Sequence, residues 1–275
     1  MTRRSARTQL LLFIALCAFT AINLTPVIWA FLTSIKQPVD AFAIPPKLVF
    51  TPTAEFHHAV WVEKSFGRFL LNSVVISVST VILSVGCGTM AAYALSRMQG
   101  GPARGVLYGL AAMRMFPQIL LAIPFFVLAR FWGLIDSYAA IVLALVAVNQ
   151  PFTIWLMRSF FLDVPQELDE SAAIDGCTVW QSFSRVALPL VRPGLWVTML
   201  FSLLLSYNEF LFAMVLTGPH TKTLPVAIAE YGAEDISYWS LSAAAAIGIM
   251  LPIVAFMVML QRHLVRGLSM GAVKG

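Results

Sequence analysis

The stretch Phe69–Leu95 reads FLLNSVVISVSTVILSVGCGTMAAYAL and contains no Asp, Glu, Lys or Arg. A helix rises about 1.5 Å per residue, so this stretch is long enough to cross the roughly 30 Å hydrocarbon core of a bilayer. Working outward from it, we find further stretches of the same kind on both sides. The sequence predicts one all-α polytopic membrane domain over residues 1–275, with six spans at about 10–33, 69–95, 105–128, 138–161, 191–216 and 241–261.

The composition supports this class. Of 275 residues, 59% are hydrophobic and only 11% are charged, whereas a soluble domain carries about 25% charged residues. Most of the exterior must therefore face lipid. The net charge of +5 comes from scattered Lys and Arg rather than a basic block, so we expect no nucleic-acid partner. Cys17, Cys87 and Cys177 lack CxxC spacing, and we expect no metal site.

The connections between spans differ in their basic residues. One side carries eleven of them: Arg3, Arg4, Arg7, Arg97, Arg104, Arg158, Arg185, Arg192, Arg262, Arg266 and Lys274. The other side carries six: Lys36, Lys47, Lys64, Arg68, Arg130 and Lys222. Since Lys and Arg are enriched in cytoplasmic loops, we expect both termini in the cytoplasm of a bacterial inner membrane. The first apolar run, from Leu10 to about Phe31, exceeds a signal-peptide core and predicts an uncleaved span.

The longest cytoplasmic connection, Leu162–Leu190, reads LDVPQELDESAAIDGCTVWQSFSRVALPL. Asp163 with Gln166 predicts a capping box at the start of a helix, and Asp175-Gly176 predicts its end. A second short helix follows, with a predicted apolar stripe at Val179, Trp180, Phe183 and Val186. This connection, residues 163–190, contains five carboxylates, which an anionic membrane surface would repel. Docking into a cytoplasmic protein fits it better than lying on lipid headgroups.

The same segment resembles the "EAA" loop of binding-protein-dependent ABC importers. Glu170-Ser171-Ala172 stands for the Glu-Ala-Ala triplet, Gly176 has the family spacing, and Val186-Ala187-Leu188-Pro189 closes the motif, with Ser171 and Val186 as departures. The resemblance implies that residues 163–190 form a coupling segment, with a coupling helix that fits a groove on an ATPase subunit. The positions expected to couple to the ATPase are Glu170, Ser171, Ala172, Asp175, Gly176, Leu188 and Pro189.

Three further stretches resemble the smaller, maltose-type six-span permease of carbohydrate importers. They are residues 206–217, 223–227 and 267–275. The resemblance implies that this chain forms half of the path for a sugar or sugar derivative. The implied partners are a second permease subunit, two ATPase subunits that bind ATP and Mg, and a periplasmic or lipoprotein solute-binding protein. In relatives the C-terminal tail reaches toward the ATPase, so Gly271–Gly275 is expected to do so. A permease for an amino acid, peptide or polyol stays open as an alternative.

Polar groups inside spans mark possible pathway residues. Arg114 lies about nine residues, or roughly 14 Å, into the third span, where a charge is a functional hypothesis by default. Glu209 is its obvious partner, but a depth difference of about 10 Å makes direct pairing doubtful. Amides and phenols that suit sugar hydroxyls, or equally bonds between helices, are Asn149, Gln150, Tyr207 and Asn208.

Other classes fit the sequence less well. There is no G-x-x-x-x-G-K-[ST] loop, so the chain is expected to bind no ATP and no cofactor of its own and not to be an enzyme. A secondary transporter would predict inverted repeats and leaves the coupling segment without a purpose. A membrane enzyme would need a catalytic cluster, and no such cluster is visible in the sequence.

Overall fold

The computed structural model describes residues 6–98, 100–234 and 238–272, and these residues form helices and connections without a strand. Four helices are long and apolar enough to cross a membrane: α1 (Ala6–Ser34), α4 (Phe66–Arg97), α7 (Tyr138–Leu162) and α14 (Trp239–Ala272). Two bent helix pairs raise the total to six if each pair is one span. The all-α membrane class is confirmed. Single helices cover residues 10–33, 69–95, 138–161 and 241–261, and their role as membrane spans stays a prediction.

The chain divides into two compact units, Met1–Gly67 with Ile228–Leu251 and Arg68–Ala227 with Pro252–Gly275. The expected single membrane domain stays a prediction.

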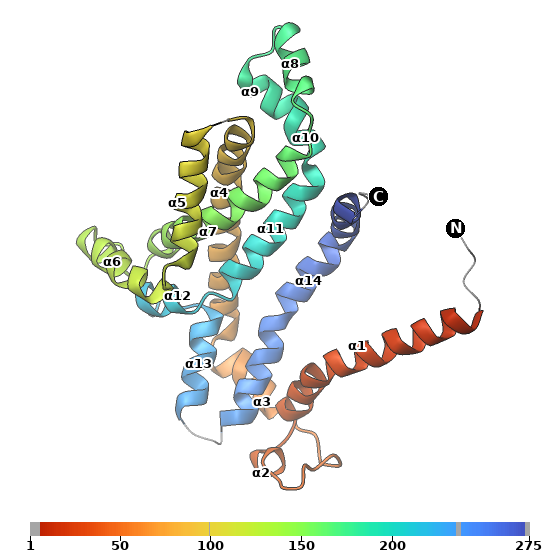
Figure 1. The fold of residues 1–275 in the computed structure, drawn as a ribbon. Coiled ribbons are helices and arrows are strands. Elements are labelled where there is room, and N and C mark those ends of the chain that lie inside the picture. The colour runs from red at the N-terminus through yellow and green to blue at the C-terminus, as the bar shows by residue number, and fades with distance from the viewer. Residues whose placement is uncertain (1–5, 99, 235–237, 273–275) are drawn as a thin grey trace. The chain divides into compact units, whose positions relative to one another are not determined.

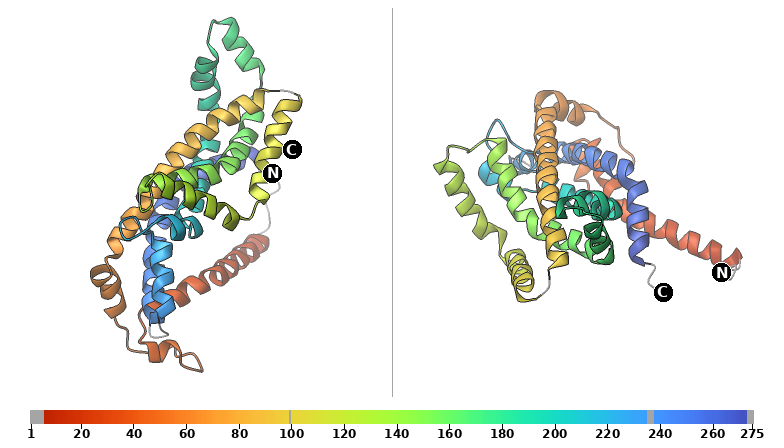
Figure 2. Two further views of the ribbon diagram at one scale, coloured as in Figure 1. Left: turned by 90° about the vertical axis from the view of Figure 1, so that its left-hand side faces the viewer. Right: turned by 90° about the horizontal axis from the view of Figure 1, so that it is seen from above.

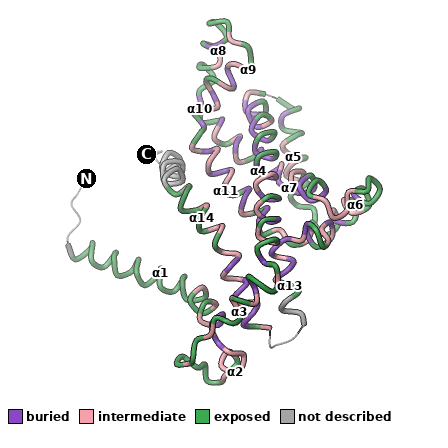
Figure 3. The backbone as a smooth tube through the Cα atoms, turned by 180° about the vertical axis from the view of Figure 1, so that it is seen from behind, coloured by how far each residue is buried: buried purple, intermediate pink, exposed green. Residues whose placement is uncertain are grey.

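In the first unit, α1 is a long apolar helix whose surface is exposed along most of its length (Figure 3). It is followed by α2 (Pro38–Ala41), α3 (Glu55–His58) and a π-helical turn, Ala59–Glu63. The loop after α1 is fixed by Lys36, which is 2% exposed. Its Nζ donates to the Lys47 carbonyl at 2.7 Å and lies over the rings of Trp29 and Phe50. These contacts compensate the buried ammonium and hold the loop against the end of α1.

The second unit is built around α7, much of which is buried (Figure 3). It packs against α5 (Gly101–Met115), α11 (Arg192–Tyr207) and α12 (Leu211–Leu216). One core joins α7 to α12 and to α6 (Gln118–Phe131), and a second joins α7 to α4 and the coupling segment. Helix α13 (Leu224–Glu234) also begins in this unit.

The predicted span 105–128 is not one helix. It breaks into α5 and α6, which are bent by 95° at Phe116-Pro117. Phe116 is extended at ψ 132° and Pro117 at ψ 122°. Proline disfavours the helical conformation in the residue before it and lacks an N–H to continue the ladder, so the helix ends there. Pro26, Pro124, Pro151 and Pro252 lie inside helices that continue past them.

The predicted span 191–216 is also interrupted. Helix α11 ends at Tyr207 and α12 begins at Leu211. Glu209 accepts a hydrogen bond on Oε1 from the backbone N–H of Phe212 at 3.0 Å, and so satisfies a donor at the start of α12. At its other end, α11 is bent by 81° from the short helices Val179–Leu190.

Small residues allow close helix crossings in the second unit. A Cβ built on Gly194 of α11 would lie 2.3 Å from the Phe160 ring of α7. A Cβ on Gly88 of α4 would lie 2.6 Å from Thr153 Cγ2. Glycines at such contacts are typical of packed membrane helices.

We expect Gly194→Ala to lower stability by about 1–3 kcal/mol, because the added methyl overpacks the crossing with Phe160. Gly109→Ala is the matched control, since a Cβ there meets no atom within 4 Å. Gly194 is the third residue of α11, where helix propensity counts less than at Gly109 inside α5, so a stability difference beyond about 1 kcal/mol reports the clash. Thermal unfolding in detergent measures it, and equal melting temperatures for the two variants would contradict the expectation.

Candidate functional site

The coupling segment, residues 163–190, protrudes beyond the end of α4 and α11 (Figures 1 and 2). It forms α8 (Glu167–Ile174), α9 (Val179–Gln181), a π-helical stretch Ser182–Ala187, and α10 (Leu188–Leu190). The helix–turn–helix predicted from the sequence is thus present. Gly176, at φ +83°, ends α8 as expected.

The predicted capping box at Asp163 and Gln166 is wrong. Asp163 is the C-cap of α7, and α8 begins only at Glu167. Pro165 explains the shift, because the residue before a proline is kept out of the helical region and helix formation starts later. A complete capping box occurs instead at the second helix, between Thr178 and Gln181.

One carboxylate ties the coupling segment to α4. Asp169 Oδ2 accepts from Arg97 Nε at 2.7 Å, and its Oδ1 accepts from Tyr93 Oη at 2.9 Å and from the Ser182 hydroxyl. We call these four residues the Asp169 clasp. Arg97 also donates from Nη1 to the carbonyls of Phe161 and Val164, at 3.1 and 3.2 Å. Both charged side chains are under one-fifth exposed.

The electrostatics of the clasp favour the charged form of Asp169. Burial by itself would raise the pKa of this carboxyl. The hydrogen bonds from Ser182 and Tyr93 and the positive charge of Arg97 outweigh it, so the pKa lies below its ordinary value. The clasp is therefore ionised at neutral pH. The sequence did not reveal it, although an arginine at the end of the second span was a visible signal for a carboxylate partner.

The remaining residues of the coupling segment divide into an inner and an outer face. Ala172, Phe183 and Ala187 are buried. The side chains of Ile174, Val179 and Trp180 are 87%, 78% and 61% exposed. The predicted apolar stripe is thus split, since Phe183 packs inward while Val179 and Trp180 face out.

The residues expected to couple to an ATPase are not all exposed, since Ala172 lies in the buried inner face. Glu170, Ser171, Asp175 and Gly176 are exposed, while Leu188 and Pro189 are half-buried where the segment returns to α11. An exposed carboxylate beside exposed apolar side chains suits a protein partner. The assignment of these residues to an ATPase contact stays a prediction.

Two predicted pathway amides bond between helices. Asn149 is 6% exposed and donates from Nδ2 to Ser206 Oγ at 2.8 Å, joining α7 to α11. Gln150 donates from Nε2 to the Ser84 carbonyl at 3.2 Å, joining α7 to α4. These bonds match the alternative that such amides hold helices together.

The three predicted pathway residues at the end of α11 have different surroundings and do not form one site. Tyr207 is 3% exposed, whereas Asn208 is exposed and donates to the Leu204 carbonyl at 2.9 Å. Glu209 is engaged at the start of α12. None of these three residues lines the cavity that contains Arg114.

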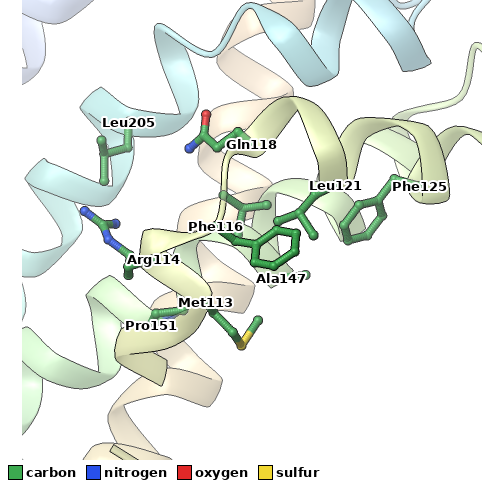
Figure 4. A pocket seen from close by; sticks show the side chains of 10 residues that line it. Met113, Arg114, Phe116, Gln118, Leu121, Phe125, Ala147, Pro151 and Leu205 are labelled. Atoms are coloured by element: carbon green, nitrogen blue, oxygen red, sulfur yellow. The ribbon is translucent and has the colours of Figure 1, made fainter. Parts of the chain in front are cut away.

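Arg114 lines a cavity of about 400 Å³ where α5 breaks into α6. Its walls come from both sides of the break and from α7 and α11: Met113, Phe116, Gln118, Leu121, Phe125, Ala147, Val148, Pro151 and Leu205 (Figure 4). The guanidinium lies over the Phe152 ring, 5.5 Å from its centroid. Among the described residues, no carboxylate forms an ion pair with it.

The helix dipole alone does not compensate the energetic cost of placing the Arg114 charge inside a membrane. Arg114 is in the last turn of α5, where the helix dipole favours a cation by about 0.3–1 kcal/mol. An arginine at the centre of a membrane helix costs about 2.5–3.5 kcal/mol on insertion scales. At the depth predicted from the sequence, the dipole would offset only part of this cost; in the structure the Arg114 side chain is exposed at the end of α5.

A second polar cluster, which the sequence did not predict, orders the connection after α12. Asp136 accepts hydrogen bonds from the backbone N–H groups of Gly218, His220 and Thr221 and from the Thr221 hydroxyl, at 2.7–3.1 Å. Burial opposes its ionisation, but these four donors outweigh burial and lower the pKa of Asp136. The described residues bring together no three His, Cys, Asp or Glu side chains that could hold a metal.

Comparison with known proteins extends these observations. Residues 84–270 match the family "Binding-protein-dependent transport system inner membrane component". The chain is 37% identical to a probable ABC transporter permease, y4oR, of Sinorhizobium fredii, over 99% of this chain and 98% of the relative. It is 35% identical to the trehalose transport system permease SugB of Mycobacterium tuberculosis, over 92% and 93%. It is 30% identical to the trehalose/maltose permease MalG of Thermococcus litoralis, over 99% of each chain.

A solved structure shares the fold. It is a bacterial ABC transporter involved in the import of the acidic polysaccharide alginate. The match has a TM-score of 0.73 at 22% identity and covers 95% of this chain and 99% of that chain.

Proposed function

Since the chain belongs to the binding-protein-dependent transport system inner membrane component family, we propose that it is the permease subunit of an ATP-driven importer for a sugar or sugar derivative. The cargo rests on relatives at 30% identity or more that are named for trehalose and maltose transport and align over nearly their whole length. The resemblance to carbohydrate permeases found in the sequence is thereby confirmed.

The single observation that carries the coupling mechanism is the coupling segment of residues 163–190. It combines an exposed outer face with an inner face fixed to α4 through the Asp169 clasp. A segment held in this way can transmit a push from a partner to the helices, because the contacts at its base resist bending. ATP and Mg would be bound by two partner ATPase subunits, and nucleotide-driven closure would move the permease between outward-open and inward-open states.

The complete transporter would also need a second permease subunit and a solute-binding protein. We place both termini in the cytoplasm on the distribution of Lys and Arg. The proposed reach of Gly271–Gly275 toward the ATPase falls partly on residues 273–275, which lie outside the described residues.

The test is ATP-driven uptake by the assembled complex in proteoliposomes, supplied with its binding protein. We expect accumulation of a sugar only when ATP and the ATPase subunits are both present. Sugar uptake that continues without the ATPase subunits would identify a secondary transporter. Uptake of amino acids, peptides or polyols without any sugar would assign the permease to another cargo.

A further inference from the structure

The cavity at the break between α5 and α6 brings two polar side chains into a largely apolar space. Figure 4 shows the ends of Arg114 and Gln118 directed toward the same region beside Leu205 of α11. The two residues come from opposite sides of the Phe116-Pro117 break. The two residues are four positions apart, a spacing that also brings side chains together on a continuous helix, and both line this cavity across the break.

The size and lining of the cavity suit a small ligand. Its volume of about 400 Å³ lies within the roughly 300–1,000 Å³ of small-molecule sites. The walls are apolar, with the Phe116 and Phe125 rings among them, and the few polar groups fix orientation. An amide such as that of Gln118 can both donate to and accept from a hydroxyl.

The guanidinium of Arg114 is available for an external acceptor. Within the part of the chain that the structure describes, it has a contact with the Phe152 ring but no ion pair. Glu209, the expected partner, is engaged at the start of α12. Arginine presents its N–H donors in a planar fork that matches a carboxylate or another oxyanion, even while one face contacts an aromatic ring.

We propose that this cavity binds the acidic group of an anionic sugar, a carboxylate or sulfonate, with Arg114 as the charge partner and Gln118 as a hydroxyl partner. The inference rests on the proposed function and narrows its substrate class. A neutral sugar offers the exposed guanidinium only hydrogen-bond acceptors, whereas an anionic group also forms a charge-assisted, bidentate pair with it. Specificity for acidic over neutral cargo follows, because a site built around a charge discriminates against a ligand that lacks the opposite charge.

The experiment uses the complete complex in proteoliposomes and matched sugar pairs: maltose and trehalose, and the corresponding disaccharides that carry a glucuronic acid unit. The wild type is compared with Arg114→Gln, Arg114→Lys and Arg130→Gln. Arg130 is an exposed arginine at the end of α6 that does not line the cavity, so it controls for loss of one positive charge. Liposomes of phosphatidylcholine alone and with phosphatidylglycerol distinguish a cargo anion from a lipid headgroup.

We expect the wild type to take up an acidic disaccharide. Arg114→Gln should reduce that uptake at least tenfold while changing uptake of a neutral sugar less than twofold. Arg114→Lys should retain more acidic uptake than Arg114→Gln, and Arg130→Gln should behave as wild type. The ratio of acidic to neutral uptake should not depend on phosphatidylglycerol.

Three results would overturn the inference. If the wild type takes up only neutral sugars, the inference of an anionic cargo is wrong, although the proposed function as a sugar importer still holds. Equal loss of acidic and neutral uptake in Arg114→Gln would make Arg114 a structural residue, for example an ion-pair partner of the second permease. An Arg114 effect seen only with phosphatidylglycerol would assign the cavity to lipid. ATP-driven uptake of amino acids but no sugar would instead refute the proposed function itself.

Discussion

Glu170→Lys is expected to abolish ATP-driven uptake while leaving the protein inserted and the complex assembled. Glu170 is exposed on α8 beside the exposed apolar side chains of Ile174, Val179 and Trp180. Its neighbour Asp169 points into the clasp, whereas Glu170, the carboxylate of the triplet, is exposed to a partner. Reversing a charge in a protein contact costs more than removing it, because attraction becomes repulsion at the same position.

The expected loss of uptake in Glu170→Lys follows from the energies of charge pairs in protein interfaces. Loss of one partner of a hydrogen-bonded charge pair costs about 2–5 kcal/mol, and each 1.4 kcal/mol is about tenfold. Uptake should therefore fall at least tenfold, and ATP hydrolysis stimulated by the loaded binding protein should fall with it.

The matched control for this charge reversal is Glu63→Lys. Glu63 has a side chain that is 64% exposed and lies outside the coupling segment. The Glu63→Lys variant changes the net charge by the same amount as Glu170→Lys, and we expect it to transport like the wild type. Unchanged uptake in Glu170→Lys would remove the assignment of this residue to the ATPase contact.

Disruption of the Asp169 clasp is expected to have the second large effect, on both stability and uptake. Asp169→Asn or Arg97→Gln should each destabilise the protein and lower uptake, while ATP hydrolysis falls less than uptake does. The charged partners are under one-fifth exposed, so we expect a loss between the 0–1 kcal/mol of surface pairs and the 3–5 kcal/mol of buried ones, about 1–3 kcal/mol. The coupling segment would remain attached to the chain but would transmit motion to α4 poorly.

A double-mutant cycle distinguishes a true clasp from two independent defects. The Arg97→Gln/Asp169→Asn double variant should lose less than the sum of the single losses, because each single change already removes the pair. Thermal unfolding and uptake are measured on the same preparations. Arg104→Gln, an exposed arginine of α5, is the control. Strictly additive losses would show that the pair does not couple the segment to α4.

Several features of the protein could be predicted because they depend on residues close in sequence. An uncharged run such as Phe69–Leu95 needs only its own length and composition to form α4. Asp175-Gly176 ends α8 as predicted. Gly176 has a φ of +83°, a backbone conformation that glycine adopts without steric cost and that does not depend on distant parts of the fold. The family resemblance of residues 163–190 is likewise local, since a spacing motif is carried by adjacent positions.

Other features were decided by the tertiary structure. Proline lacks the N–H that continues a helix, yet α5 ends just before Pro117 whereas α7 continues through Pro151, which is buried. Both prolines remove a backbone N–H, so their surroundings make the difference: Pro151 is buried among neighbouring helices, whereas Pro117 is exposed at the break.

The same holds for the polar groups. Asp169 and Glu170 are adjacent carboxylates, but only the fold brings Asp169 to Arg97, 72 residues away, and leaves Glu170 exposed. The sequence by itself determined that this chain spans a membrane and carries a coupling segment, because apolar length and turn residues act locally. Only the tertiary structure decided which charges are engaged and that Arg114 faces a cavity, because burial and ion pairing depend on helices far apart in the chain.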